Sequence, residues 1–215
     1  KDLGSDIWVS SLDGSPAVRM TTTGNGIYHR TVYWSHDGAF LVFESNREDD
    51  QSALYTMSAS GGRVTRITST LSYEGHPAWS PDGQWIAFTS DRGGRPQVYR
   101  VSVSGGSPQR MTFEGSYNAD ASWSPDGKSI ALISRSRGDQ VAILDLDSRG
   151  MQTISTGSLN ESPSYAPNGS MVVYAAAGGV LSVVAVDYDV QQRLAAQSGE
   201  VRDPAWSPFL IKRKP

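Results

Sequence analysis

The sequence predicts an all-β protein, a β-propeller of four-stranded antiparallel blades, on two observations. First, an aromatic-Ser-Pro-Asp-Gly motif recurs along the 215 residues, its aromatic returning at steps of 45, 44, 42 and 41 residues. A period in the low forties is typical of one propeller blade. Second, no segment joins helix caps to a sustained helical period. The five aromatics are Trp34, Trp79, Trp123, Tyr165 and Trp206.

One repeat shows why each segment is expected to be a strand. Residues 76–79 form a short first strand, and residues 80–83 suit a tight turn, because proline presets φ and glycine accepts positive φ. The run 85–90 is too short for a helix and predicts a strand buried on both faces. Residues 97–103 and 109–113, joined by a Ser-Gly-Gly-Ser turn, supply the third and fourth strands.

The other copies repeat this order of strands. The second, third and fourth strands are expected at 40–45, 54–58 and 64–68, at 130–134, 141–145 and 152–155, and at 171–175, 181–186 and 192–195.

The two ends of the chain complement each other. Residues 7–10 and 18–22 supply third and fourth strands without a first, whereas residues 203–206 supply a first strand alone. We expect them to pair as one blade, because closure leaves no open sheet edge. Whether residues 209–212 form its second strand stays open. The prediction is one domain over residues 1–215, and six blades would require an oligomer or a longer parent chain. Its five blades are 1–22 plus 203–215, 30–68, 76–113, 120–155 and 162–195.

Composition argues against several classes of function. The net charge is −3 at pH 7 and both signs are spread throughout, so no basic stripe predicts nucleic-acid binding. The longest apolar runs, 171–177 and 180–186, are far shorter than the roughly 20 residues of a membrane span. Cysteine is absent, which excludes disulfides and thiolate sites. The first four residues do not resemble a signal peptide.

The recurring motif residues are expected to be structural. Each motif aromatic holds one fixed place in its repeat, which favours packing between blades over a ligand platform. Asp37, Asp82 and Asp126 lie on separate turns, so they should cap turns rather than bind a metal. The three histidines are too few and too scattered for a zinc or manganese site, and no Ser/His/Asp arrangement can be assigned. We therefore expect no catalytic residue.

Function is expected in the lead-in segments, the residues three to six positions before each motif aromatic. These segments differ in every copy and should surround the channel mouth, where variable loops on a rigid scaffold usually bind. Tyrosine, arginine and histidine among hydrogen-bonding groups are typical of protein recognition. The predicted partner-binding residues are His29, Arg30, Tyr73, Glu74, His76, Tyr117, Asn118, Asp120, Asn160, Glu161, Arg202 and Asp203. A cation or water held by Asp120, Glu161 and Asp203 is an open alternative.

Longer stretches resemble one family. The motif with the run 89–100 after it, and the stretches 105–118, 159–171 and 204–210, resemble the TolB-type β-propeller family. Ala166-Pro167-Asn168-Gly169 and the ending Trp206-Ser207-Pro208-Phe209-Leu210 are more specific than the repeat itself. The resemblance covers about residues 76–209, whereas residues 1–75 share only the general repeat.

The resemblance implies a non-catalytic, periplasmic protein of the Tol-Pal envelope system. It implies that the propeller docks a peptidoglycan-associated lipoprotein, with residues 74–76 and 118–120 at the matching contact positions, and that colicin-type peptides can use the same face. It implies no cofactor beyond calcium in the channel, no nucleic acid and no membrane insertion. Three alternatives stay open: an accessory propeller of a hydrolase, a sugar-acting propeller enzyme, and a shortened or recombined propeller without independent function.

Overall fold

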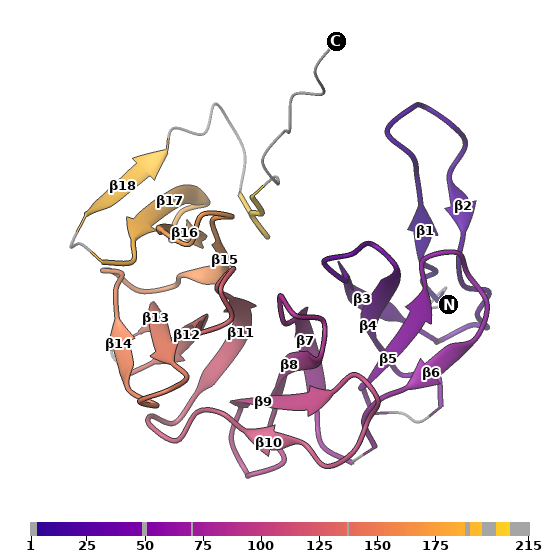
Figure 1. Ribbon diagram of the computed structural model, residues 1–215, viewed down its shortest axis with the longest axis horizontal. Helices are drawn as coiled ribbons and strands as arrows, with labels where there is room; N and C mark the ends of the chain where they lie inside the picture. Colours follow the sequence, from indigo (N-terminus) through magenta and orange to yellow (C-terminus); the bar gives the residue numbers. More distant parts are fainter. Residues whose placement is uncertain are drawn as a thin grey trace. The chain divides into compact units, whose positions relative to one another are not determined.

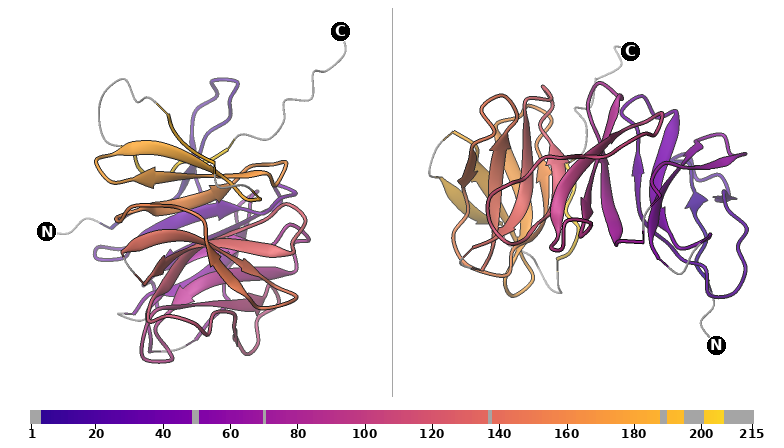
Figure 2. Two further views of the ribbon diagram at one scale, coloured as in Figure 1. Left: turned by 90° about the vertical axis from the view of Figure 1, so that its left-hand side faces the viewer. Right: turned by 90° about the horizontal axis from the view of Figure 1, so that it is seen from below.

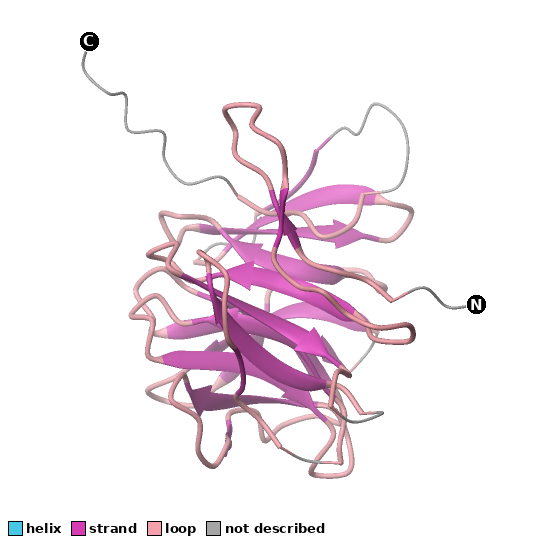
Figure 3. Cartoon of the chain, turned by 90° about the vertical axis from the view of Figure 1, so that its right-hand side faces the viewer, coloured by secondary structure: helices cyan, strands magenta, loops and turns pink. Residues whose placement is uncertain are grey.

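The computed structural model describes residues 4–48, 51–69, 71–136, 138–187, 190–194 and 201–206. The chain divides into two compact units, Lys1–Met111 and Thr112–Pro215, and each is described by itself. Across the described residues the regular structure is β-strand without helix, as Figure 3 shows. This confirms the predicted all-β class.

The first unit holds two four-stranded sheets and a hairpin (Figure 1). All neighbouring strands are antiparallel and follow one another in chain order. The strands of the sheets are β3 (His29–Trp34), β4 (Phe40–Ser45), β5 (Ala53–Ser58) and β6 (Val64–Arg66), and β7 (Glu74–Trp79), β8 (Trp85–Ser90), β9 (Gln97–Ser102) and β10 (Gln109–Arg110). The hairpin pairs β1 (Trp8–Val9) with β2 (Val18–Arg19).

The second unit repeats the same construction, and Figure 2 shows its two sheets packed one upon the other. Its strands are β11 (Asn118–Trp123), β12 (Ser129–Arg135), β13 (Asp139–Asp145) and β14 (Met151–Thr153), and β15 (Glu161–Tyr165), β16 (Met171–Ala176), β17 (Val180–Ala185) and β18 (Gln191–Leu194). Each predicted set of four strands therefore forms one sheet, with the blade architecture expected from the period.

The second strand of every four-stranded sheet lies in the core. Phe43, Phe88, Leu132 and Tyr174, one from each second strand, have no solvent-exposed surface. Burying an aromatic or large aliphatic side chain contributes about 1.5–3 kcal/mol, so these strands supply much of the hydrophobic stabilisation. Their burial on both faces explains why their sequences are continuous apolar runs rather than alternating ones.

The tight turns after the first strands are held by their own side chains. Ser124 Oγ donates to Asp126 Oδ1 at 2.7 Å, and the same oxygen accepts the Lys128 N–H at 3.0 Å. Asp37 and Asp82 occupy the same place in their turns. The hydrogen bond from the serine is the largest influence that lowers the pKa of each of these three carboxyls. The predicted turn-capping role of the motif aspartates is confirmed.

The amino-terminal hairpin follows the strand order of a third and fourth strand. In complete sheets a backbone N–H near the start of the third strand donates a hydrogen bond to a buried hydroxyl group that follows the fourth strand. Leu54 N, for example, donates to Thr68 Oγ1 at 3.0 Å. Ile7 N makes the corresponding bond to Thr21 Oγ1 at 2.9 Å. Residues 7–10 and 18–22 thus take the predicted place in the repeat.

Closure of the seam blade stays a prediction. Among the described residues β1 and β2 form a two-stranded sheet of their own, and residues 203–206 are in no strand. Trp206 is half-buried and its Nε1 donates to Ser164 O at 3.1 Å. The predicted second strand of that blade, 209–212, lies outside the described residues.

The motif aromatics of complete neighbouring sheets pack as predicted. Trp79 lies in one core cluster with Val42, Leu54 and Ile67 of the preceding sheet. Tyr165 lies in another with Ala131 and Val141, and Trp123 is also buried.

Trp34 is the exception, and its predicted packing role is corrected. Its side chain is 49% exposed, against 7% for Trp79. The sheet that precedes it along the chain consists, in the described residues, of β1 and β2 alone. Before Trp79 the second strand of the preceding sheet supplies Val42 to its cover, and no such strand precedes Trp34 among the described residues.

This contrast yields a stability prediction. Trp79→Ala should lower the free energy of unfolding by about 3–5 kcal/mol, because it removes a buried aromatic and leaves a cavity. Trp34→Ala, at the same motif position, should cost less than about 1 kcal/mol. Urea denaturation of the two variants measures both values. Equal losses of unfolding free energy in the two variants would show that other residues cover Trp34, which would contradict its exposure.

Candidate functional site: the lead-in segments

A left-handed residue recurs at one position of every lead-in segment. The residue three before each motif aromatic has a positive φ: 45° at Thr31, 53° at His76, 55° at Asp120, 52° at Ser162 and 47° at Asp203. In β3, β7, β11 and β15 the register shifts at this point, which marks a β-bulge. None of the five is glycine, so each conformation is maintained against steric cost by the surrounding sheet.

The bulge re-aims one side chain from each first strand. Bulges commonly redirect side chains beside binding sites. Asp203 shares the conformation although residues 203–206 are in no strand, which extends the first-strand pattern to the fifth repeat. In the second unit the bulge residues of successive repeats meet, because Ser162 Oγ donates to Asp203 Oδ1 at 2.7 Å.

In the first unit the bulge residue contacts a buried carboxylate that sequence reasoning missed. Thr31 Oγ1 donates to Glu44 Oε2 at 3.2 Å, and Ser52 Oγ donates to Glu44 Oε1 at 2.7 Å. A Cβ at Gly75 would lie 2.6 Å from Glu44 Oε2 and 2.1 Å from the Tyr73 hydroxyl. A side chain at position 75 would therefore displace the ends of these two side chains from β7. No signal in the sequence separated Glu44 from other strand carboxylates.

Glu74 lies below the surface rather than on it. Its side chain is fully buried and forms an ion pair with Arg92, whose guanidinium lies 5.3 Å from the Phe88 ring centre and 5.1 Å from that of Tyr99. Burial raises the pKa of Glu74, while the Thr68 hydroxyl and the Arg92 charge oppose the rise. Because it has no exposed atoms, Glu74 leaves the set of direct contact residues and supports the segment from beneath.

Three more predicted contact residues are buried, and two of them, Asn118 and Asn160, make hydrogen bonds through their side chains. Asn118 Nδ2 donates to Glu114 O at 2.7 Å. Asn160 Nδ2 donates to Ser155 Oγ at 3.0 Å. His29 is 7% exposed. All three change from expected contact residues to supports, because a partner reaches only exposed atoms.

The other eight predicted residues have accessible side chains. Arg30, Glu161, Arg202 and Asp203 are exposed, and Tyr73, His76, Tyr117 and Asp120 are half-buried. Two aromatic contacts order part of this set: Tyr73 meets His76 edge-on at 6.5 Å between ring centres, and the Arg135 guanidinium lies 4.2 Å from the Tyr117 ring centre.

Two supports could have been found from the period. Asn46 and Asp91 each lie twelve residues after a motif tryptophan. Asn46 Oδ1 accepts the Tyr28 N–H at 2.7 Å, and Asp91 Oδ1 accepts the Tyr73 N–H at 3.0 Å. Arg92, the next residue after Asp91, forms its ion pair with Glu74. Both residues occupy the same position of the repeat and carry a side-chain oxygen, and this pattern in the sequence could have identified them as supports.

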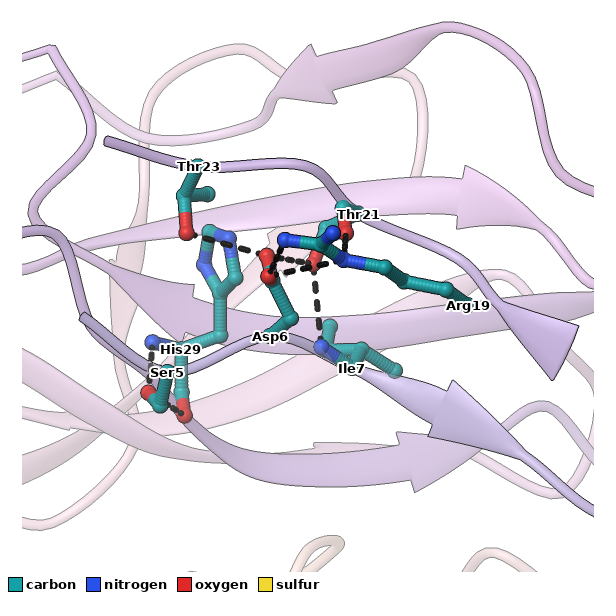
Figure 4. Close-up of polar contacts among 7 residues, drawn as sticks. All are labelled: Ser5, Asp6, Ile7, Arg19, Thr21, Thr23 and His29. Atoms are coloured by element: carbon teal, nitrogen blue, oxygen red, sulfur yellow. Dashed lines mark hydrogen bonds and ion pairs between the residues drawn. The ribbon is translucent and has the colours of Figure 1, made fainter. Parts of the chain in front are cut away.

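The amino-terminal segment is fastened to the first lead-in segment by a polar network (Figure 4). Asp6 Oδ1 accepts from the hydroxyls of Thr21 and Thr23 at 2.9 Å each, and Asp6 forms an ion pair with Arg19. The Ser5 hydroxyl accepts the His29 N–H at 2.9 Å and donates to the His29 carbonyl oxygen at 3.1 Å. His29 is thus held by its backbone, while its ring packs edge-on against Phe43.

The His29 ring is buried without hydrogen bonds. Neither ring nitrogen has a partner, and the ring centre lies 5.2 Å from that of Phe43. Burial lowers the pKa of His29, the charge of Arg47 lowers it further, and Asp6 opposes the shift. A protonated His29 is therefore disfavoured in the folded protein.

The described residues contain no group of three or more His, Cys, Asp or Glu side chains placed to hold a metal. Calcium in the channel, which the resemblance implies, and a cation or water held by Asp120, Glu161 and Asp203 both stay predictions. Within the described part, no helix is long and apolar enough to cross a membrane.

The buried imidazole gives a pH prediction. Below its ordinary pKa, near 6.5, His29 gains a proton in the unfolded chain but resists it in the folded one, so stability should fall with the pH. His29→Phe should reduce the loss of melting temperature between pH 7.5 and about pH 5, a range in which carboxylates stay largely ionised. His36→Gln, at an exposed turn position, is the matched control and should keep the wild-type slope. The same slope in His29→Phe as in the wild type would contradict the assignment.

Comparison with known proteins identifies the family. The family model of the TolB beta propeller domain matches residues 2–210. The Tol-Pal system protein TolB of Bordetella parapertussis is 45% identical over 163 residues, which is 74% of this chain and 37% of that protein. The one from Thioalkalivibrio sulfidiphilus is 47% identical over 87 residues, 37% of this chain and 20% of that protein. The chain thus spans well under half the length of these relatives.

Solved structures agree with the family match. The crystal structure of TolB from Acinetobacter baumannii superposes with a TM-score of 0.82 at 36% identity, covering 94% of this chain and 51% of that one. An oligogalacturonate lyase in complex with manganese has a TM-score of 0.70 at 16% identity, covering 95% of this chain and 62% of that one, and shows the fold alone. The repeated blades, the motif turns and the match across residues 2–210 together show that the chain belongs to the TolB β-propeller family.

Proposed function

We propose that the chain is a non-catalytic binding propeller of the Tol-Pal system that docks a peptidoglycan-associated lipoprotein in the periplasm. The observation on which this rests is the TolB propeller match over residues 2–210, together with relatives named as Tol-Pal system proteins. The chain covers only part of those relatives, so docking by this chain alone is the point to test.

The geometry of the lead-in segments supports a binding surface. The left-handed residue of each repeat presents a polar side chain, and buried Glu74, Asn118 and Asn160 support the backbone beneath. Rigid presentation lowers the entropy lost on binding. Accessible tyrosine and arginine side chains are the types that most often dominate binding energy at protein interfaces.

The proposed contact set is accordingly smaller than the one expected from sequence. It consists of the eight accessible lead-in residues, whereas His29, Glu74, Asn118 and Asn160 act as supports. Colicin-type peptides should compete for the same set if they use this face. The sugar-acting alternative has only a similarity of fold, at 16% identity, in its favour and is not proposed.

Calorimetric titration with the soluble domain of a peptidoglycan-associated lipoprotein tests the proposal. Binding should be saturable, and Tyr73→Ala or His76→Ala should weaken it by about tenfold or more, because each removes an accessible aromatic from the lead-in segments. Gln84→Ala, at an exposed position on a tight turn, is the control and should leave the affinity unchanged.

The buried supports provide a second measurement. Asn160→Ala should weaken binding together with a lowered melting temperature, because it frees the backbone of its lead-in segment. Tyr73→Ala should weaken binding with little change in melting temperature. The absence of any affinity in the folded wild-type chain would refute the proposal.

A further inference from the structure

A cavity of about 790 Å³ lies between the two sheets of the second unit. Its walls come from the tight turns 124–129 and 167–169 and from the loop that joins β13 to β14. These turns lie at the opposite ends of β11 and β15 from the lead-in segments. The cavity is therefore separate from the surface proposed for the lipoprotein.

Two side chains of the cavity lining are smaller here than at the same repeat positions in the first unit. The corresponding cavity of the first unit is about 280 Å³ and is lined by Phe40 and Trp79. Ser129 and Tyr165 occupy those two positions in the second unit. Serine and tyrosine are smaller than phenylalanine and tryptophan, so these two side chains take up less of the groove in the second unit.

The floor and walls of the cavity combine polar and apolar groups. Tyr165 is buried, and its hydroxyl lies 2.9 Å from Ser129 Oγ, a pair that retains further hydrogen-bonding capacity. Ile143, Ile154 and Val186 provide apolar wall surface. Such walls suit the methylene stem of a long side chain whose end is polar.

The charged groups of the lining are mainly negative. Asp126, Asp145 and Asp187 line the cavity, with Lys128 as the cationic side chain among its lining residues. Asp126 and Asp145 each accept hydrogen bonds from their own turns through Oδ1. Burial raises the pKa of the Tyr165 hydroxyl, and the Asp126 and Asp187 charges add to the rise, which fits a negative environment.

We propose that this cavity binds the basic side chain of an extended peptide segment of a partner protein. The apolar walls hold the aliphatic stem, and the carboxylates at the rim accept hydrogen bonds from the guanidinium or ammonium group. Arginine suits the site best, because its planar group can donate to the carboxylates and to the Tyr165 hydroxyl together. Charge complementarity selects this occupant over an acidic or neutral segment.

Titration of the isotope-labelled chain with acetyl-Gly-Arg-Gly-amide, followed by NMR, tests the proposal. Saturable shifts are expected at the amides of Ser129, Tyr165 and Val186, at millimolar peptide. The same tripeptide with norleucine, which keeps an aliphatic stem without the charge, should bind at least about tenfold more weakly. Equal binding of the norleucine peptide, or no saturable shift at these amides, would overturn the proposal. Binding of free cadaverine as tightly as the peptide would overturn the peptide assignment.

Variants separate cavity shape from charge. Tyr165→Trp and Ser129→Phe restore the bulk found in the first unit and should abolish binding. Asp145→Asn should weaken peptide binding by about threefold to tenfold. The expected loss is modest because the Asp145 carboxylate is exposed to solvent. Asp147→Asn changes an exposed carboxylate outside the cavity and should have no effect.

A melting curve for each variant shows whether the fold is kept. If Tyr165→Trp does not fold, the proposal is tested by comparing the peptide affinities of the Asp145→Asn and Asp147→Asn variants. Unchanged affinity in a folded Tyr165→Trp variant, or equal losses in the two aspartate variants, would contradict a site in this cavity.

Discussion

Within each unit, packing of one motif aromatic on the preceding sheet is the interaction on which the arrangement of the two blades depends. Trp79 joins the core of the sheet before it through Val42 and Ile67, and Tyr165 does the same through Val141. One side chain per repeat thus fixes a whole sheet against its neighbour, because the second strands already fill each sheet's own core. Trp34 shows the converse: the same residue in the same motif is half exposed where only the β1–β2 hairpin precedes it.

With the sheets fixed in this way, the first strands can tolerate a local distortion. The left-handed residue three positions before each aromatic costs conformational energy, and it recurs in all five repeats regardless of whether the residue is Thr, His, Asp or Ser. Buried polar contacts beneath it, such as the Glu74–Arg92 ion pair and the Asn160 amide bonds, hold the connecting backbone. The rigid core and the variable surface are thus joined by a layer of buried polar groups.

The repeat also allows one position to serve different purposes in different blades. Phe40 and Trp79 nearly fill the groove between the sheets of the first unit, whereas Ser129 and Tyr165 leave a cavity with an acidic rim in the second. The aspartates of the motif turns stay occupied by their own serine and backbone partners in both units. Side-chain size at matching repeat positions therefore differs between the two grooves of a repeated fold.

The sequence alone determined the blade period, the four strands of each sheet and the turn role of Asp126, because these depend on neighbours within one repeat. It also placed the lead-in segments, but it could not separate accessible Tyr73 and His76 from buried Glu74 and Asn118. Polar residues serve equally as surface contacts and as buried hydrogen-bond partners, and only packing by distant segments distinguishes the two. The exposure of Trp34 and the volume beside Tyr165 were likewise decided by tertiary structure, since each depends on side chains of another repeat.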